Sequence, residues 1–325
     1  MNDASGYIVV LRNRNFLVLW LAQILSLLSL NSTMFVAIFL VTDVTKSSTQ
    51  TAAVISAFSL PAVFLAAIAG LVVDRISKKD ILVVSNALRL LLQLLLGLFA
   101  GLAVSRSSNT QFWLLLVYLD ILVASAVGQF FAPAEGAMIP LVVGNADLLS
   151  ANSLFTLTVI GTQVAAMMVL VPLSVKALGT VNSLLLLALF YLGATALVAI
   201  LPRDSVKRRE SLGMSSIYRR AWQELAEGWH FSITHRQVFL GILHLGLVAF
   251  LIFSVSSILP KYATSVLGLA IADAVFVFSP AGVGIVISSL LVVRYGQRFP
   301  RYALLSSPVP NRMCVSSPRG GLCET

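Results

Sequence analysis

Two ionisable residues lie inside long apolar stretches of the sequence, where a charge requires an explanation. Arg89 falls within the stretch 81–104, and Asp120 falls within the stretch 112–134. A charge at the centre of a bilayer costs about 2.5–3.5 kcal/mol on insertion scales, so such residues usually pair or serve a function. At a rise of about 1.5 Å per residue, each lies roughly 12 Å from the membrane face at which its own stretch begins.

The two stretches begin at opposite faces of a hydrocarbon core about 30 Å thick, so the depths of Arg89 and Asp120 differ by only about 6 Å. An arginine side chain can cover that difference. We therefore expect the two residues to form an ion pair or to share a water-filled cavity. Asp120 is then either the structural partner of Arg89 or a carboxylate that binds and releases protons.

Uncharged polar residues within the apolar stretches are a second set of candidates. These residues are Gln23, Asn31, Asn86, Gln93, Gln129 and Gln163. They could line a cavity for a small molecule, or they could form hydrogen bonds between helices, each worth about 0.6 kcal/mol. Glu135 follows the stretch 112–134, so we expect it to lie near lipid headgroups and to orient a loop.

The sequence carries no pattern that is typical of catalysis. It contains no nucleophile elbow, no His/Glu spacing suited to a metal and no phosphate-binding glycine loop. The two cysteines, Cys314 and Cys323, form neither a disulfide framework nor a four-ligand metal site. We therefore expect no enzyme activity, no metal and no cofactor. A channel would require a selectivity filter or a ring of charge, and neither is visible.

The elements that position these residues are apolar stretches long enough to cross a bilayer. The chain is 58% hydrophobic and 11% charged, whereas soluble domains average about 25% charged residues. The stretches are 16–41, 51–73, 81–104, 112–134, 150–174, 181–201, 238–260 and 270–293. A helix needs about 20 apolar residues to span, and the short alternation typical of barrel strands is missing. These features predict an all-α, polytopic transmembrane helix bundle surrounded by membrane lipid.

The positive charges predict how the bundle is oriented. On one side lie Arg12, Arg14, Arg75, Lys78, Lys79, the basic residues between 203 and 236, and those from Arg294 onward. The opposite loops hold one each: Lys46, Arg106, Lys176 and Lys261. The positive-inside rule then places both termini and the segment 202–237 in the cytoplasm. A net charge of +9 distributed in this way does not indicate a nucleic-acid partner.

The domain organisation follows from the stretches. We expect a six-helix half over residues 1–201, a cytoplasmic linker over 202–237, two further helices over 238–293, and a cytoplasmic loop with a disordered tail over 294–325. Within the linker, Tyr218, Trp222, Leu225 and Trp229 fall at helical spacing. They indicate an amphipathic helix that either lies at the membrane interface or merely connects the halves. The Ser- and Pro-rich composition of 306–325 suggests that it replaces a ninth helix.

The loop between the second and third stretches resembles the signature of the major facilitator superfamily. It reads Gly70-Leu-Val-Val-Asp74-Arg75-Ile-Ser-Lys78-Lys79. Two more stretches are similar to the bacterial branch that includes drug and siderophore exporters. They are Asn13-Arg14-Asn15-Phe16 with Leu19-Trp20-Leu21, and Phe131-Ala-Pro-Ala-Glu135-Gly-Ala-Met-Ile-Pro140 with Leu148-Leu-Ser-Ala-Asn152-Ser-Leu154.

The resemblance implies twelve helices in two halves with substrate bound between them, of which this chain supplies about eight. It implies a secondary transporter in the bacterial inner membrane that exports a small amphiphilic molecule, such as a drug or siderophore, with the proton as coupling ion. Gly70, Asp74, Arg75, Lys78 and Lys79 would then latch the cytoplasmic side. The alternative is a truncated membrane protein or gene remnant that does not transport.

Overall fold

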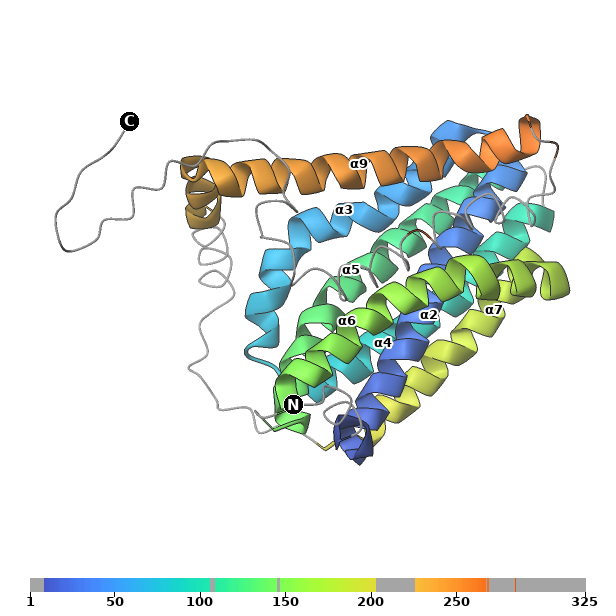
Figure 1. Ribbon diagram of the computed structural model, residues 1–325. Helices are drawn as coiled ribbons and strands as arrows, with labels where there is room; N and C mark the ends of the chain where they lie inside the picture. The colour runs from blue at the N-terminus through green and yellow to red at the C-terminus, as the bar shows by residue number, and fades with distance from the viewer. Residues whose placement is uncertain are drawn as a thin grey trace, which may run out of the picture. The chain divides into compact units, whose positions relative to one another are not determined.

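The computed structural model describes residues 9–105, 109–144, 147–202 and 226–266, together with Gly268 and Gly284. The chain divides into two compact units, Met1–Val283 and Gly284–Thr325, and the helices described below belong to the first (Figure 1). They are α2 (Arg14–Thr45), α3 (Ser48–Val73), α4 (Lys78–Ser105), α5 (Thr110–Val142), α6 (Leu148–Ala165), a five-residue π-helix (Ala166–Leu170), α7 (Val171–Ile200) and α9 (Arg236–Ser265). The all-α prediction is confirmed.

The helices between residues 14 and 200 are apolar and long enough to cross a membrane. They are Arg14–Thr45, Ser48–Ala66, Lys78–Ser105, Thr110–Val142 and the continuous helical stretch Leu148–Ile200. That last stretch is 53 residues long, and Gly179 interrupts it with a non-helical backbone of φ 79° and ψ 168°. The interruption falls between the predicted fifth and sixth spans, within the last of the five helical stretches that are long and apolar enough to cross a membrane in the described part of the chain.

The start of α2 is fixed by a single asparagine side chain. The Asn13 side-chain oxygen accepts hydrogen bonds from the backbone N–H groups of Asn15 and Phe16, at 3.0 and 3.3 Å. Its Nδ2 donates to the carbonyl oxygen of Val142, 2.9 Å away at the end of α5. Asn13 therefore caps α2 and also ties it to the end of α5.

Helices α2 to α7 pack as one bundle, in which α4 contacts α5 and α7, α2 contacts α7, and α3 contacts α5 most extensively (Figure 1). Two clusters of buried apolar side chains form the core. One includes Val36, Leu96 and Val117, and the other includes Leu19, Leu82 and Met138. On α2 and α4, buried polar residues lie between the two clusters along the chain, as Ser125 does on α5. The bundle therefore has a polar layer between two apolar layers.

The seventh predicted span, 238–260, lies within α9. Residues 226–234 of the predicted linker are helical, and the Trp229 side chain there is exposed. Tyr218, Trp222 and Leu225 of the expected amphipathic helix fall outside the described residues, as do nearly all of the predicted eighth span, 270–293, and the whole of the tail, 306–325.

Candidate functional site

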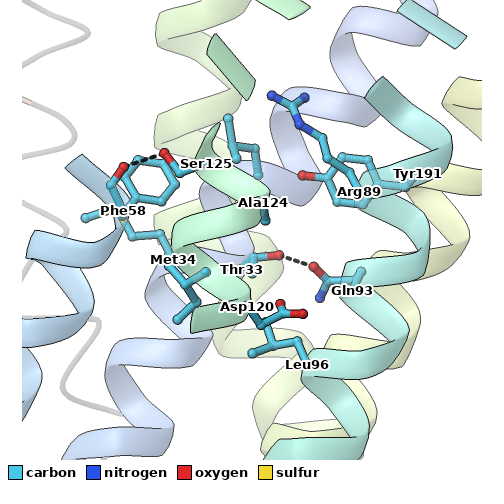
Figure 2. A pocket seen from close by; sticks show the side chains of 12 residues that line it. Thr33, Met34, Phe58, Arg89, Gln93, Leu96, Asp120, Ala124, Ser125 and Tyr191 are labelled. Atoms are coloured by element: carbon cyan, nitrogen blue, oxygen red, sulfur yellow. Dashed lines mark hydrogen bonds between the residues drawn. The ribbon is translucent and has the colours of Figure 1, made fainter. Parts of the chain in front are cut away.

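A narrow cavity opens within the polar layer, among α2, α3, α4, α5 and α7 (Figure 2). Most of its lining is apolar, with side chains such as Leu30, Met34, Phe58 and Leu96. Its polar lining residues are Thr33, Arg89, Gln93, Asp120, Ser125 and Tyr191. The two charged residues that the sequence singled out therefore line one cavity, with α4 contributing Arg89 and α5 contributing Asp120.

Arg89 is only 3% exposed and lies against aromatic rings. Its guanidinium carbon lies 4.9 Å from the ring centroid of Phe131 on α5 and 6.0 Å from that of Tyr191 on α7. A cation over an aromatic face is stabilised by the ring quadrupole, by about 2 kcal/mol or more where water is excluded. The two rings therefore stabilise the guanidinium at this depth, and among the described residues no ion pair to it is formed.

Asp120 is 5% exposed, and its Oδ1 has no hydrogen-bond partner among the residues that the structure describes. Figure 2 shows the Arg89 guanidinium directed away from the Asp120 carboxylate. In the described ranges no ion pair joins the two side chains. The ion pair expected from their depths is therefore not formed, because the guanidinium packs on aromatic rings at the other end of the cavity.

Glu135 lies inside α5, whereas the predicted stretch ended at residue 134, and its position near lipid headgroups stays a prediction. Helix α5 continues to Val142, so Glu135 lies seven residues, or about 10 Å, inside the end of the helix. Its side chain is 7% exposed, and it attracts Arg89 electrostatically. The signal was present in the sequence, since Asp120, Phe131 and Glu135 follow one face of an α-helix.

Uncharged polar side chains connect the helices around the cavity. The Thr33 hydroxyl donates to the Gln93 Oε1, at 2.9 Å, and Gln93 Nε2 donates to the Leu184 carbonyl oxygen on α7, at 3.1 Å. The Ser125 hydroxyl donates to the carbonyl oxygen of Phe58 on α3 (Figure 2). These bonds fix the helices that carry Arg89 and Asp120.

Of the six uncharged polar residues offered as cavity groups, Gln93 lines this cavity, and the other five do not: Gln23, Asn31, Asn86, Gln129 and Gln163. Gln23 is buried, and its Oε1 lacks a partner in the part of the chain that is described. Asn31 is half-buried and Gln163 is exposed. Gln129 Nε2 donates to the backbone carbonyl of Ser125, at 3.3 Å.

The signature loop connects α3 to α4. Gly70 lies in α3, Asp74 caps the end of that helix, and Lys78 and Lys79 begin α4. The Asp74 side chain is exposed, and a Cβ added at Gly70 would meet no heavy atom within 4 Å in the described ranges.

The Lys79 side chain forms a hydrogen bond within the protein. Its ammonium group donates to the carbonyl oxygen of Leu201, next to the end of α7. The loop is therefore fastened to the last helix of the first six, which joins the α3–α4 turn to α7. Arg75 lies in the turn and is half-buried.

The part of the chain described by the structure holds no group of three or more His, Cys, Asp or Glu side chains placed to bind a metal ion. Among the curated proteins compared with this chain, none matches it. The sequence model of the Major Facilitator Superfamily matches residues 19–309. That range includes the cavity, the signature loop and every helix from α3 to α9, so the match rests on most of the chain. It supports the transporter prediction, and it does not favour the inactive alternative. The chain therefore belongs to the Major Facilitator Superfamily and is a multi-pass membrane transporter, not an enzyme.

Proposed function

We propose that this protein is a proton-coupled exporter of a small amphiphilic molecule, such as a drug or siderophore, across the bacterial inner membrane. The composition of the cavity lining supports this substrate class, because it is mainly apolar with a few convergent polar groups. The cavity has a volume of about 20 Å³, so a substrate would bind in a conformation in which it is wider. Affinity would then come chiefly from desolvation of the apolar part of the substrate, and the polar side chains would orient it.

The observation that carries proton coupling is the environment of Asp120. Its carboxyl group lines the cavity, is almost fully buried, and has an oxygen without a hydrogen-bond partner in the described part of the chain. A buried carboxylate that lacks a cationic partner is costly in the ionised form, and protonation removes that cost. An acid placed at the substrate cavity can therefore exchange a proton for substrate as the cavity changes its exposure.

The direction of transport rests on sequence similarity. The segments Asn13–Leu21 and Phe131–Leu154 resemble those of drug and siderophore exporters. The charge bias of the loops supports cytoplasmic termini, so the α3–α4 loop would face the cytoplasm. There Gly70, Asp74, Arg75, Lys78 and Lys79 would act as the conformational latch, and the contact of Lys79 with Leu201 supports that role.

The test uses the purified full chain in proteoliposomes with an imposed pH gradient. The probes are ethidium, an amphiphilic cation, and a catecholate siderophore. We expect the gradient to drive movement of at least one probe and a protonophore to abolish it. Asp120→Asn should remove the gradient-driven component but keep substrate exchange at equal pH, since the amide fills the same volume and cannot ionise.

The matched control is Asp43→Asn. Asp43 is exposed and forms an ion pair with Lys46 at 2.6 Å, near the end of α2 and away from the cavity. Its loss should leave gradient-driven movement unchanged. Gradient-independent movement of both probes, or Asp120→Asn transport equal to that of the unmodified protein, would refute proton coupling through Asp120.

A further inference from the structure

Gly128 is the residue on which the Arg89 guanidinium lies. A Cβ added to Gly128 would be 2.5 Å from Arg89 Nη2 and 3.5 Å from its Cζ. Real Cβ atoms essentially never approach another heavy atom to less than 3.0 Å. The guanidinium therefore occupies the space that any side chain at position 128 would take.

The surroundings of Arg89 are closed on one side and open on the other. Phe131 lies one turn further along α5, with its ring centroid 4.9 Å from the guanidinium carbon, and Glu135 lies one turn beyond that. In the opposite direction is the cavity, which Arg89 shares with Asp120. A guanidinium displaced from Gly128 has the Phe131 ring on one side and the cavity on the other, so we expect it to move toward the cavity and Asp120.

Gly128 lies midway between the two buried acids of α5. It is eight residues from Asp120 and seven from Glu135, or about 12 Å and about 10 Å along the helix. All three residues of the charged set, Arg89, Asp120 and Glu135, are less than a tenth exposed. Each also has an atom without a hydrogen-bond partner in the described ranges. The position of the single guanidinium therefore decides which acid is compensated.

No further charged side chain lines the cavity among the described residues. Among the lining residues that α2, α3, α4, α5 and α7 contribute, the charged side chains are Arg89 and Asp120, and the further titratable group is the Tyr191 hydroxyl. The field at Asp120 is therefore set mainly by how far away the guanidinium is.

We propose that Gly128 is a positioning residue, whose missing side chain seats the Arg89 guanidinium beside Phe131 and keeps the Asp120 carboxyl group free of that positive charge. The role extends the proposed function, because a carboxyl group without a fixed cation can take up and release a proton. The rings of Phe131 on α5 and Tyr191 on α7 also pack against the guanidinium.

The test measures the protonated state of Asp120 directly. Dicyclohexylcarbodiimide adds to a protonated carboxyl group in an apolar site and rearranges to a stable N-acylurea, which tandem mass spectrometry locates. The experiment compares the full chain in detergent with Gly128→Ala and with the double variant Gly128→Ala/Arg89→Gln. The matched control is Gly136→Ala on the same helix, where an added Cβ meets nothing within 4 Å among the described residues.

We expect labelling of Asp120 in the unmodified protein and in Gly136→Ala. In Gly128→Ala it should fall by about tenfold or more, because a unit charge brought from about 12 Å to about 4 Å favours the ionised acid strongly at an effective dielectric constant near 20. The double variant should recover the labelling, since it keeps the alanine but removes the charge. A protein that is merely misfolded by alanine would not recover.

Equal labelling of Asp120 in Gly128→Ala and the unmodified protein would overturn the proposal, and so would a loss that Arg89→Gln does not restore. The readout needs no transport. A protein that follows the expected labelling pattern but moves neither probe along the pH gradient would therefore refute the proposed function and leave the role of Gly128 standing.

Discussion

Replacing Asn13 tests how the segment that resembles exporters acts in the fold. In Asn13→Ala, α2 loses the side-chain acceptor for the N–H groups of Asn15 and Phe16, worth about 1 kcal/mol as an N-cap. The bond from Asn13 Nδ2 to the Val142 carbonyl is lost as well, at about 1 kcal/mol. We expect unfolding in mixed detergent micelles to require about 2 kcal/mol less free energy than in the unmodified protein.

Two variants separate these contributions. Asn13→Ser keeps a capping oxygen but cannot reach Val142, so about half of the loss should remain. Asn15→Ala is the matched control, because its side chain is exposed and its backbone N–H is unchanged. If Asn13→Ser loses as much stability as Asn13→Ala, the cap does not contribute, and if Asn15→Ala loses as much, the effect is not specific to position 13.

Two further substitutions probe the helices around the cavity with the same assay. Gly179→Ala should lower the free energy of unfolding by about 1–3 kcal/mol, because φ 79° and ψ 168° are strained for any L side chain. An unchanged free energy of unfolding would show that the interruption at Gly179 does not need glycine. Gln93→Leu should lose about 1 kcal/mol through its bonds to Thr33 and Leu184. That loss stays small because the Thr33 hydroxyl, once Gln93 is gone, can donate its one proton to the Ser29 carbonyl. A stability equal to that of the unmodified protein would refute the expected loss.

The membrane spans could be predicted because hydropathy alone decides them. A helix must satisfy its own backbone groups in lipid, so an apolar run of sufficient length has few alternatives. The predicted boundary between the fifth and sixth spans agrees with the break at Gly179. The fourth predicted stretch ends at residue 134, whereas α5 continues past Glu135 to Val142.

The pairing of the buried charges could not be predicted from depth. Arg89 and Asp120 were placed at similar depths, and an arginine side chain can point toward either end of its helix. What decides its direction is a recess at Gly128 and two aromatic rings, one of which belongs to α7, about a hundred residues further along the sequence. A pattern read along one helix cannot predict a contact with a residue that is so distant in the sequence.

The face of α5 nevertheless carries information that a helical reading of the sequence can recover. Asp120, Ala124, Gly128, Phe131 and Glu135 follow one another at intervals of three or four residues, so they share one face. This face has an acid at each end, Asp120 and Glu135, with Gly128 and the Phe131 ring between them. One cation can therefore lie at different positions along the face. Because Asp120 and Ala124 of that face line the cavity, the height of the Arg89 guanidinium determines the charge that a bound molecule meets. The same helix face would then govern both proton uptake at Asp120 and the polarity of the substrate site.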